Sequence, residues 1–223
     1  KRSMMFSQEI GQISVKVSFA CYMLMLLPQI YLNIRRHSLD GFSWGMHLIL
    51  LGSSICDSFY AFANRMPWQY YAVDLVLIAL LGLQHVQYWR YQRDRLPRSY
   101  GVATIGLASF AIIGTILFQA FPEKRGLFAL LGYVSMVGFF TASLPQIIAN
   151  HRLGSAEGAA VSFIVLQTLG LMSDTVSAYA LHWGLPNRIG APASLVFQVV
   201  LLLQLWFYRA PSAGDRNALR RCT

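Results

Sequence analysis

Seven apolar stretches, each about 20 residues long, take up most of the 223-residue chain and leave only short charged gaps between them. A helix needs roughly 20 mostly apolar residues to cross the hydrocarbon core of a bilayer. Lipid offers no hydrogen-bond partners, so such a segment must satisfy its own backbone groups as a helix. The sequence therefore predicts an all-α membrane protein with spans at about 12–33, 44–63, 68–89, 100–121, 127–149, 161–183 and 189–208.

The composition agrees with a membrane protein and argues against a nucleic-acid partner. Hydrophobic residues make up 56% of the chain and charged residues only 12%, whereas a soluble domain carries about 25% charged residues. The formal net charge of +9 comes from basic residues in the short gaps, not from a basic face on a folded domain. We expect the lipid bilayer to surround the chain, with five tryptophans near span ends, Trp183 among them, anchored at the interface.

The basic residues are unevenly divided between the two sides of the predicted bundle. Seven spans place the ends of the chain on opposite sides, with eleven arginines on the side of the C-terminus and seven lysines or arginines on the other. Cytoplasmic loops of membrane proteins carry the excess of Lys and Arg. This pattern predicts a cytoplasmic C-terminus and cytoplasmic loops after the first, third and fifth spans.

The chain contains an internal repeat. Residues 28–43, PQIYLNIRRHSLDGFS, match residues 145–160, PQIIANHRLGSAEGAA, at seven of sixteen positions without a gap, which is an offset of 117. Further on, QHVQY at 84–88 resembles QLWFY at 204–208, which lengthens the predicted offset to 120. Each half therefore contributes three helices, and the fourth span joins them.

A single connecting helix gives the two halves the same orientation across the membrane. We expect two parallel three-helix-bundle repeats joined by a linker helix, a 3+1+3 arrangement with an axis along the membrane normal. Repeats of this kind place a binding site near the midplane, where they meet. The predicted boundaries are 1–98 for the first repeat, 99–122 for the linker helix, 123–209 for the second repeat and 210–223 for a cytoplasmic tail.

A Pro-Gln pair stands at the same place in both repeats. Proline removes one backbone hydrogen bond and bends a helix, which frees carbonyl groups that need a partner. We expect Pro28 and Pro145 to act as hinges for alternating access. Gln29 and Gln146 are expected to supply amide donors or to line a wet cavity.

Three aspartates lie inside predicted spans. Asp57 and Asp174 are equivalent at the offset of 117, and Asp74 lies in the third span. An aspartate near the centre of a membrane helix costs about 2.5–3.5 kcal/mol, and such residues usually face a bundle interior or a water-filled path. Apart from Lys16, the predicted spans contain no lysine or arginine to pair with them. An acidic cavity suits a cation, a proton or both, while the alternative role of each aspartate is structural.

Five further polar residues are candidates for lining the same cavity: His47, His85, Asn33, Asn150 and Gln198. Histidine titrates near neutral pH and can relay protons, but a lone histidine in a helix bundle is more often a packed interior residue. The sequence has no nucleophile elbow, zinc-protease motif or phosphate loop. We therefore expect neither an enzyme nor a cofactor or metal ion.

The doubled motif resembles that of the PQ-loop family, a group that includes cystinosin, the lysosomal cationic amino acid exporter, the SWEET sugar transporters and the KDEL receptor. The resemblance covers about residues 12–208. LLGSSICDSFYAF is most similar to the cationic exporter, which implies that Asp57 binds a substrate cation or a proton. Asp74 resembles a third-helix aspartate of the same branch. Where these relatives have a seventh-helix aspartate this chain has Gln198, so a coupling proton would fall to Asp57, Asp74 or Asp174.

The function that the resemblance implies is transport of a small polar solute, with cationic amino acids such as arginine or lysine as the first choice and protons as candidate coupling ions. Two alternatives stay open. One is a transporter of cystine, a neutral amino acid or a sugar, and the other is a non-transporting receptor or scaffold of the KDEL-receptor type. The membrane expected is that of a lysosome-like organelle or a bacterial inner membrane.

The predicted orientation can be checked at Ser99, in the loop at 90–99 that carries most of the charge signal. A cysteine placed there, in a background without native cysteines, should react with an impermeant reagent only from the cytoplasmic side. Labelling from the opposite side would overturn the orientation.

Overall fold

The computed structural model describes residues 2–208, with side chains from Gln8 onward, and the predicted tail at 210–223 lies outside the described residues. The helices are α1 (Arg2–Arg36), α2 (Trp44–Ala63), α3 (Trp68–Gln92), α4 (Arg98–Ala120), α5 (Arg125–Phe128), α6 (Leu131–Ala142), α7 (Leu144–Leu153), α8 (Val161–Ala180) and α9 (Leu185–Phe207). Two short 3₁₀ turns precede α4 and α5, at Arg93–Arg95 and Pro122–Lys124.

The described part of the chain has seven helical segments long and apolar enough to cross a membrane, which confirms the predicted number of spans. The first segment begins earlier than predicted, at Gln8, and the fifth is longer, covering Pro122–Leu153. That fifth segment is built from α5, α6 and α7 in succession. Lys16 lies on the exposed face of α1, where its long side chain can extend toward the headgroups.

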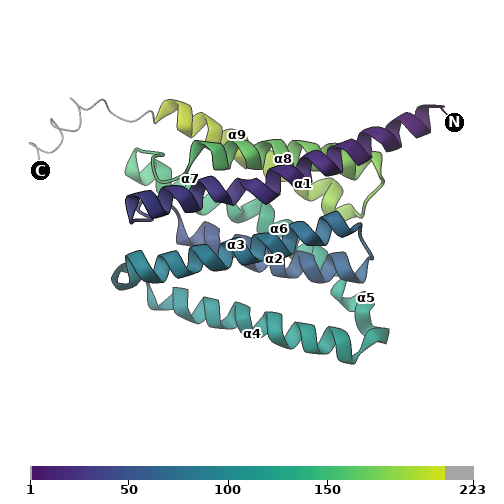
Figure 1. Ribbon diagram of the computed structural model, residues 1–223, viewed down its shortest axis with the longest axis horizontal. Coiled ribbons are helices and arrows are strands. Elements are labelled where there is room, and N and C mark those ends of the chain that lie inside the picture. The colour runs from purple at the N-terminus through teal and green to yellow at the C-terminus, as the bar shows by residue number, and fades with distance from the viewer. Residues whose placement is uncertain (1, 209–223) are drawn as a thin grey trace, which may run out of the picture.

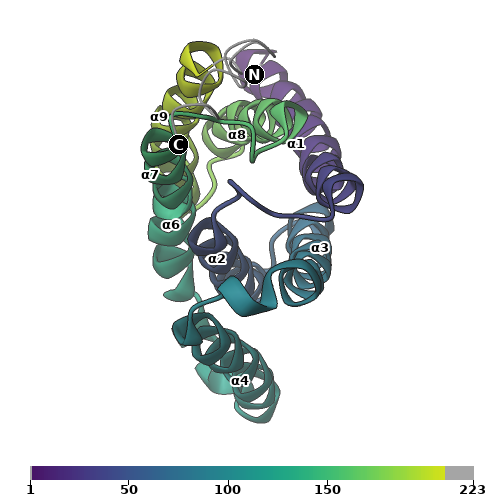
Figure 2. The ribbon, with the colours of Figure 1, turned by 90° about the vertical axis from the view of Figure 1, so that its left-hand side faces the viewer.

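Six of the seven segments form a closed ring, in the order α1, α3, α2, α6, α9 and α8 (Figure 2). Within each repeat the third helix packs between the first two, and the repeats meet where α1 packs on α8 and α2 packs on α6. The linker helix α4 lies outside the ring against α2. α1 runs in the same direction as α6 and α7 (Figure 1), so the repeats are parallel and the 3+1+3 architecture is confirmed.

Gln29, in the first repeat, binds the loop that follows α7 in the second repeat. Its Nε2 donates to Gly158 O at 3.1 Å and to Asn33 Oδ1 at 2.9 Å. Its Oε1 accepts from Ala160 N at 2.7 Å. One side-chain amide therefore satisfies a donor and an acceptor of a non-helical loop, which a membrane protein must satisfy internally wherever water is absent.

Gln146, in the second repeat, does the same for the loop that follows α1. Its Nε2 donates to Gly41 O and to Asn150 Oδ1, both at 2.7 Å, and its Oε1 accepts from Ser43 N at 2.8 Å. Each partner lies 117 residues from its counterpart in the first repeat. We call the loop hydrogen bonds of Gln29 and Gln146 the PQ clasp, because each repeat holds the loop of the other.

Further hydrogen bonds connect the clasp to the third helix of each repeat, and their positions correct one detail of the predicted repeat. Asn33 Nδ2 donates to Gln87 Oε1 at 2.8 Å, and Asn150 Nδ2 donates to Gln204 Oε1 at 3.0 Å. Gln87 and Gln204 are 117 residues apart. The offset of 117 therefore extends to the third helices, and the predicted lengthening to 120 is wrong. That prediction aligned two segments of similar sequence whose residues occupy different structural positions in the two repeats.

The two clasped loops cross at a pair of equivalent glycines. A Cβ atom built on Gly158 would lie 2.0 Å from Gly41 C, and one built on Gly41 would lie 2.8 Å from Gly158 Cα. Gly41 also has a φ of +82°, which disfavours any residue with a side chain. Positions related by a twofold axis meet each other only on that axis, so the pseudo-twofold axis passes through this crossing.

The two prolines have different local structures. α1 continues as one helix through Pro28. In the second repeat, α6 ends at Ala142 and α7 begins at Leu144, so the helix is interrupted next to Pro145. The sequence predicts a kink at both prolines. In the structure Pro28 lies within the continuous α1, and only Ser143 separates α6 from α7, with its backbone still close to the right-handed helical region (φ −76°, ψ −19°).

The side chains next to the two prolines also differ. Gln198 Nε2 donates at 2.9 Å to Oγ of Ser143, the residue between α6 and α7. The equivalent positions in the first repeat are Leu26 and Leu81, whose side chains are fully buried in the apolar core. These positions are therefore apolar in the first repeat, whereas a polar contact joins them in the second.

The clasp should contribute strongly to stability. We expect Gln29→Leu and Gln146→Leu each to lower the unfolding temperature in detergent, because each leaves loop groups without partners at about 1–3 kcal/mol per buried group. Gln92→Leu is the matched control, since its amide binds Asp40 at the exposed surface. Unfolding temperatures equal to that of Gln92→Leu would contradict the role of the clasp.

Candidate functional site

A cavity of about 120 Å³ lies inside the ring, and all six ring helices contribute to it. Its lining residues on α3 and α9 come from 69–77 and 186–194, the first turns of those helices. The clasped loops lie at the opposite end of α3 and α9. The cavity therefore occupies the half of the bundle away from the clasp, and its volume suits several waters or a small polar solute.

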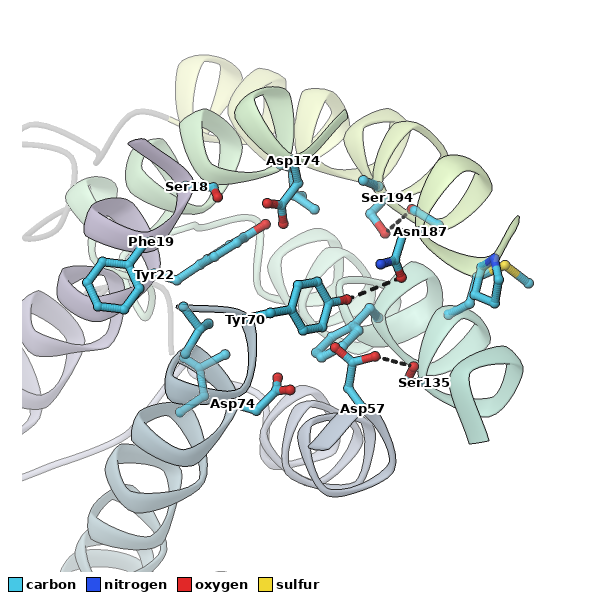
Figure 3. Close-up of a pocket in the computed structure, with 18 of the residues that line it drawn as sticks. Ser18, Phe19, Tyr22, Asp57, Tyr70, Asp74, Ser135, Asp174, Asn187 and Ser194 are labelled. Carbon is cyan, nitrogen blue, oxygen red and sulfur yellow. Dashed lines mark hydrogen bonds between the residues drawn. The ribbon is translucent and has the colours of Figure 1, made fainter. Parts of the chain in front are cut away.

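Asp57, Asp74 and Asp174 all line this cavity and reach it from α2, α3 and α8 (Figure 3). Asp57 and Asp74 are 6% and 3% exposed, and Asp174 is partly buried. Of the described residues that line the cavity, none is Lys, Arg or His. The structure thus brings the three aspartates together at the interface of the repeats and places no basic side chain beside them.

Two of the aspartates have equivalent partners across the repeat interfaces. Ser135 Oγ, on α6, donates to Asp57 Oδ1 at 2.8 Å. Asp174 faces Ser18 and Tyr22 on α1 (Figure 3), and the Ser18 hydroxyl donates to Val15 O at 3.1 Å. Ser18 and Ser135 are 117 residues apart, as are the two aspartates, so each carboxylate faces a serine of the other repeat.

Asp74 differs from the other two acids. Its Oδ2 atom is buried and has no hydrogen-bond partner in the described structure. Its equivalent in the second repeat is Ala191, so the first repeat contributes one more acid than the second. Between residues 8 and 208, no three His, Cys, Asp or Glu side chains are grouped so that they could hold a metal ion.

Tyr70 and Asn187 connect the two repeats and lie between Asp174 on one side and Asp57 and Asp74 on the other (Figure 3). The Tyr70 hydroxyl donates to Asn187 Oδ1 at 3.2 Å (Figure 3). These residues are also equivalent at the offset of 117, and they mark the pseudo-twofold axis at the end away from the clasp. Trp183 packs edge-on against Tyr70, with ring centroids 5.4 Å apart, and is only 9% exposed. The expectation that Trp183 is an interfacial anchor is wrong, because it lines the cavity instead.

The other predicted residues lie outside this cavity. Asn33 and Asn150 extend the clasp, and Gln198 binds Ser143 at the helix break. His47 and His85 belong to an aromatic cluster at the other end of the bundle, with their rings stacked at 6.1 Å. They pack with Tyr88 and with Tyr100 of the linker helix, whose hydroxyl lies 2.6 Å from His85 Nδ1.

Sequence reasoning did not identify the neutral polar residues of the cavity. Ser18, Tyr22, Tyr70, Ser135 and Asn187 carry no charge and match no motif. The signal that could have found them is the offset of 117 applied to the whole chain, because it pairs Ser18 with Ser135 and Tyr70 with Asn187.

Comparisons with known proteins agree with this architecture. A vacuolar histidine transporter of Saccharomyces cerevisiae, YPQ3, is 27% identical over 92% of this chain and 94% of its own length. A cystinosin homolog of Dictyostelium discoideum is 23% identical over 90% of this chain and 82% of its own length. The solved structure of a eukaryotic SWEET transporter has the same fold, with a TM-score of 0.65 at 14% identity over 92% of this chain and all of that one.

The PQ-loop repeat profile matches the chain twice, at residues 10–70 and 127–186. Each match contains one Pro-Gln pair and the loop that the other repeat clasps. Together the two matches cover more than half of the 223 residues, and the chain therefore belongs to the PQ-loop repeat family.

Proposed function

We propose that the protein transports amino acids with a positively charged side chain, such as arginine, lysine or histidine, and that protons accompany them. The yeast relative is named for histidine transport and the Dictyostelium relative for cystinosin, and both align with at least 90% of the chain. These relationships support a membrane transporter of a small molecule. The choice of a cationic substrate depends on the cavity.

The charge of the cavity carries the proposal. Asp57, Asp74 and Asp174 converge from three helices, and the described lining residues include no basic side chain. An ionised carboxylate removed from water is costly unless it is paired. The three carboxylates therefore favour ligands that bring positive charge over a sugar or a neutral zwitterion.

The arrangement of the acids favours a substrate with two positive groups. Asp57 and Asp174 are related by the pseudo-twofold axis and face the cavity from opposite repeats (Figure 3). A cationic amino acid carries one positive charge on its α-ammonium group and another on its side chain. It can therefore meet one carboxylate in each repeat, whereas a neutral amino acid offers a single positive group.

Protons are the proposed coupling ions. Asp74 Oδ2 has no partner in the described structure, so a proton on this carboxyl group can neutralise it when no substrate is bound. Gln198 cannot replace these acids as a proton carrier, because an amide does not titrate and its Nε2 is held by Ser143. In this proposal the three aspartates thus bind both the amino acid substrate and the proton.

The position of the cavity fits alternating access. The clasp joins the repeats at the end of the loops that the charge pattern places in the cytoplasm, and the cavity lies in the other half of the bundle. In the proposed cycle, the clasp must open before a solute can leave toward the loop side. The break next to Pro145 gives the second repeat a place to bend.

Replacing Asp57 tests the cationic substrate directly. We expect Asp57→Asn to reduce labelled arginine uptake into proteoliposomes by at least about tenfold, because one buried charge-assisted contact is worth roughly 1.5–3 kcal/mol. Asp174→Asn should weaken uptake and change its dependence on pH. Asp40→Asn is the matched control, since Asp40 pairs with Arg95 at the exposed surface and lies far from the cavity.

Several outcomes of this experiment would count against the proposal. Undiminished arginine uptake by Asp57→Asn would remove the cation site. Uptake of cystine, a neutral amino acid or a sugar, without uptake of arginine, lysine or histidine, would favour the rival transport function. Binding without uptake of any solute would favour a receptor.

The two prolines should not be equivalent in transport. We expect Pro145→Ala to slow turnover several-fold while substrate binding changes little, because alanine lets α6 and α7 join into one helix. Pro28→Ala should have a smaller effect, since α1 is already continuous there. Turnover and binding are compared by uptake rates and by ligand-induced thermal shifts. Equal effects of the two substitutions would refute the asymmetric hinge.

A further inference from the structure

We propose that Asn187 binds the carboxylate of the substrate and thereby distinguishes amino acids from amines. This inference deepens the proposed function, since it assumes that the cavity receives an amino acid. An amino acid carries a negative group as well as positive ones. A cavity with three acids and no basic lining residue repels that group, so binding requires a neutral hydrogen-bond donor placed to meet it.

Three hydroxyl donors of the cavity are already engaged. Ser135 Oγ is committed to Asp57, Ser194 Oγ donates to Gly190 O at 2.8 Å, and Tyr22 faces Asp174. Asn187 Nδ2 is different, because it is buried and has no hydrogen-bond partner in the described structure. A buried donor without a partner costs about 1–3 kcal/mol, and a ligand acceptor would remove that cost.

The contact with Tyr70 fixes the direction of this donor. The Tyr70 hydroxyl donates to Asn187 Oδ1 at 3.2 Å, so the oxygen is occupied and the amide group is oriented. In Figure 3 the nitrogen of Asn187 points into the space between Tyr70 and Asp174. The side chain therefore presents its N–H groups toward the centre of the cavity.

The local helix favours an anion at the same place. Asn187 lies in the first turn of α9, which has no side-chain cap, and residues on both sides of that helix start, Trp183 and Pro186, also line the cavity. The N-terminal end of a helix carries a partial positive charge that attracts anions. The partial positive charge of the helix end adds to the attraction for the carboxylate, while the Asn187 amide provides the hydrogen bond.

The pseudosymmetry of the bundle gives Asn187 a second proposed role, which is to set the orientation of the bound substrate. Asp57 and Asp174 are equivalent, and so are the serines that face them, so this pair of acids by itself would accept a ligand with two positive ends in either direction. Tyr70 and Asn187 are also equivalent positions, but they hold different side chains. The amide therefore adds to the asymmetry that Asp74 introduces opposite Ala191, and it gives the bound amino acid one preferred orientation.

The test compares ligands that differ only in the carboxylate. Apparent dissociation constants come from ligand-induced shifts in unfolding temperature of the purified protein, for arginine against agmatine, histidine against histamine, and cystine against cystamine. We expect the wild type to bind the amino acid roughly tenfold or more tightly than its decarboxylated partner.

Two substitutions at Asn187 should remove this preference. Asn187→Asp keeps the shape and the acceptor for Tyr70 but replaces the donor with an anion, so the amine should bind as well as the amino acid or better. Asn187→Ala removes the donor without adding charge and should also abolish the preference. Gln69→Glu is the matched control, because it adds one negative charge to the same cavity lining while Asn187 stays intact, and it should keep more of the preference than either Asn187 variant.

Each outcome decides the proposal. A wild type that binds amino acid and amine equally, an Asn187→Ala variant that keeps the full preference, or an equal loss in Gln69→Glu would overturn it. If the wild type binds cystine but not arginine or histidine, the cationic function fails, and the cystine and cystamine pair still tests Asn187. If it binds none of the three amino acids, both proposals fail.

Discussion

A bilayer supplies no hydrogen bonds to a backbone that leaves the helical path, and this constraint governs the end of the bundle where the Pro-Gln motifs lie. Each repeat turns there from its first helix into its second through a loop without regular structure. Gln29 and Gln146 satisfy the loop groups, and each does so for the opposite repeat. A single pair of side chains thus meets the hydrogen-bonding demand of the loops and fixes the register of one repeat against the other.

The acids of the cavity depend on the same two-repeat arrangement. Asp57 faces Ser135 at the interface of α2 with α6, and Asp174 faces Ser18 at the interface of α1 with α8. These are the two interfaces at which the repeats meet. A movement of one repeat against the other would therefore change the surroundings of both carboxylates.

Much of the fold could be predicted from the sequence because bilayer constraints leave strong signals. Apolar length predicts the spans, and two Pro-Gln pairs in register predict the repeat. Buried acids inside spans identify Asp57, Asp74 and Asp174 because a charge in lipid is too costly to be incidental. The family resemblance added the expected architecture, and the ring in the structure agrees with it.

The remaining features depend on packing between distant segments. Trp183 follows the rule for interfacial tryptophans in sequence, yet the fold turns it inward against Tyr70. The continuity of α1 through Pro28 is likewise not visible in the sequence, because Pro145 stands in the same motif yet lies beside the end of α6. The loop groups that bind Gln29 belong to Gly158 and Ala160, far from it in the sequence. Only the folded structure shows that each glutamine binds the loop of the other repeat. The serine and tyrosine hydroxyls and the Asn187 amide of the cavity are uncharged, so no buried charge in the sequence points to them.

The pseudo-twofold axis has a consequence for evolution. Two identical half-chains assembled around it would have to place the same residue on both sides of every axial contact, a tyrosine against a tyrosine or an asparagine against an asparagine. Joining the halves through α4 removes that restriction, because each copy of the sequence can then change alone. The meeting of Tyr70 with Asn187 is a product of this freedom. At the other end of the axis Gly41 and Gly158 have not diverged, since the closeness of the two backbones leaves no room for any side chain.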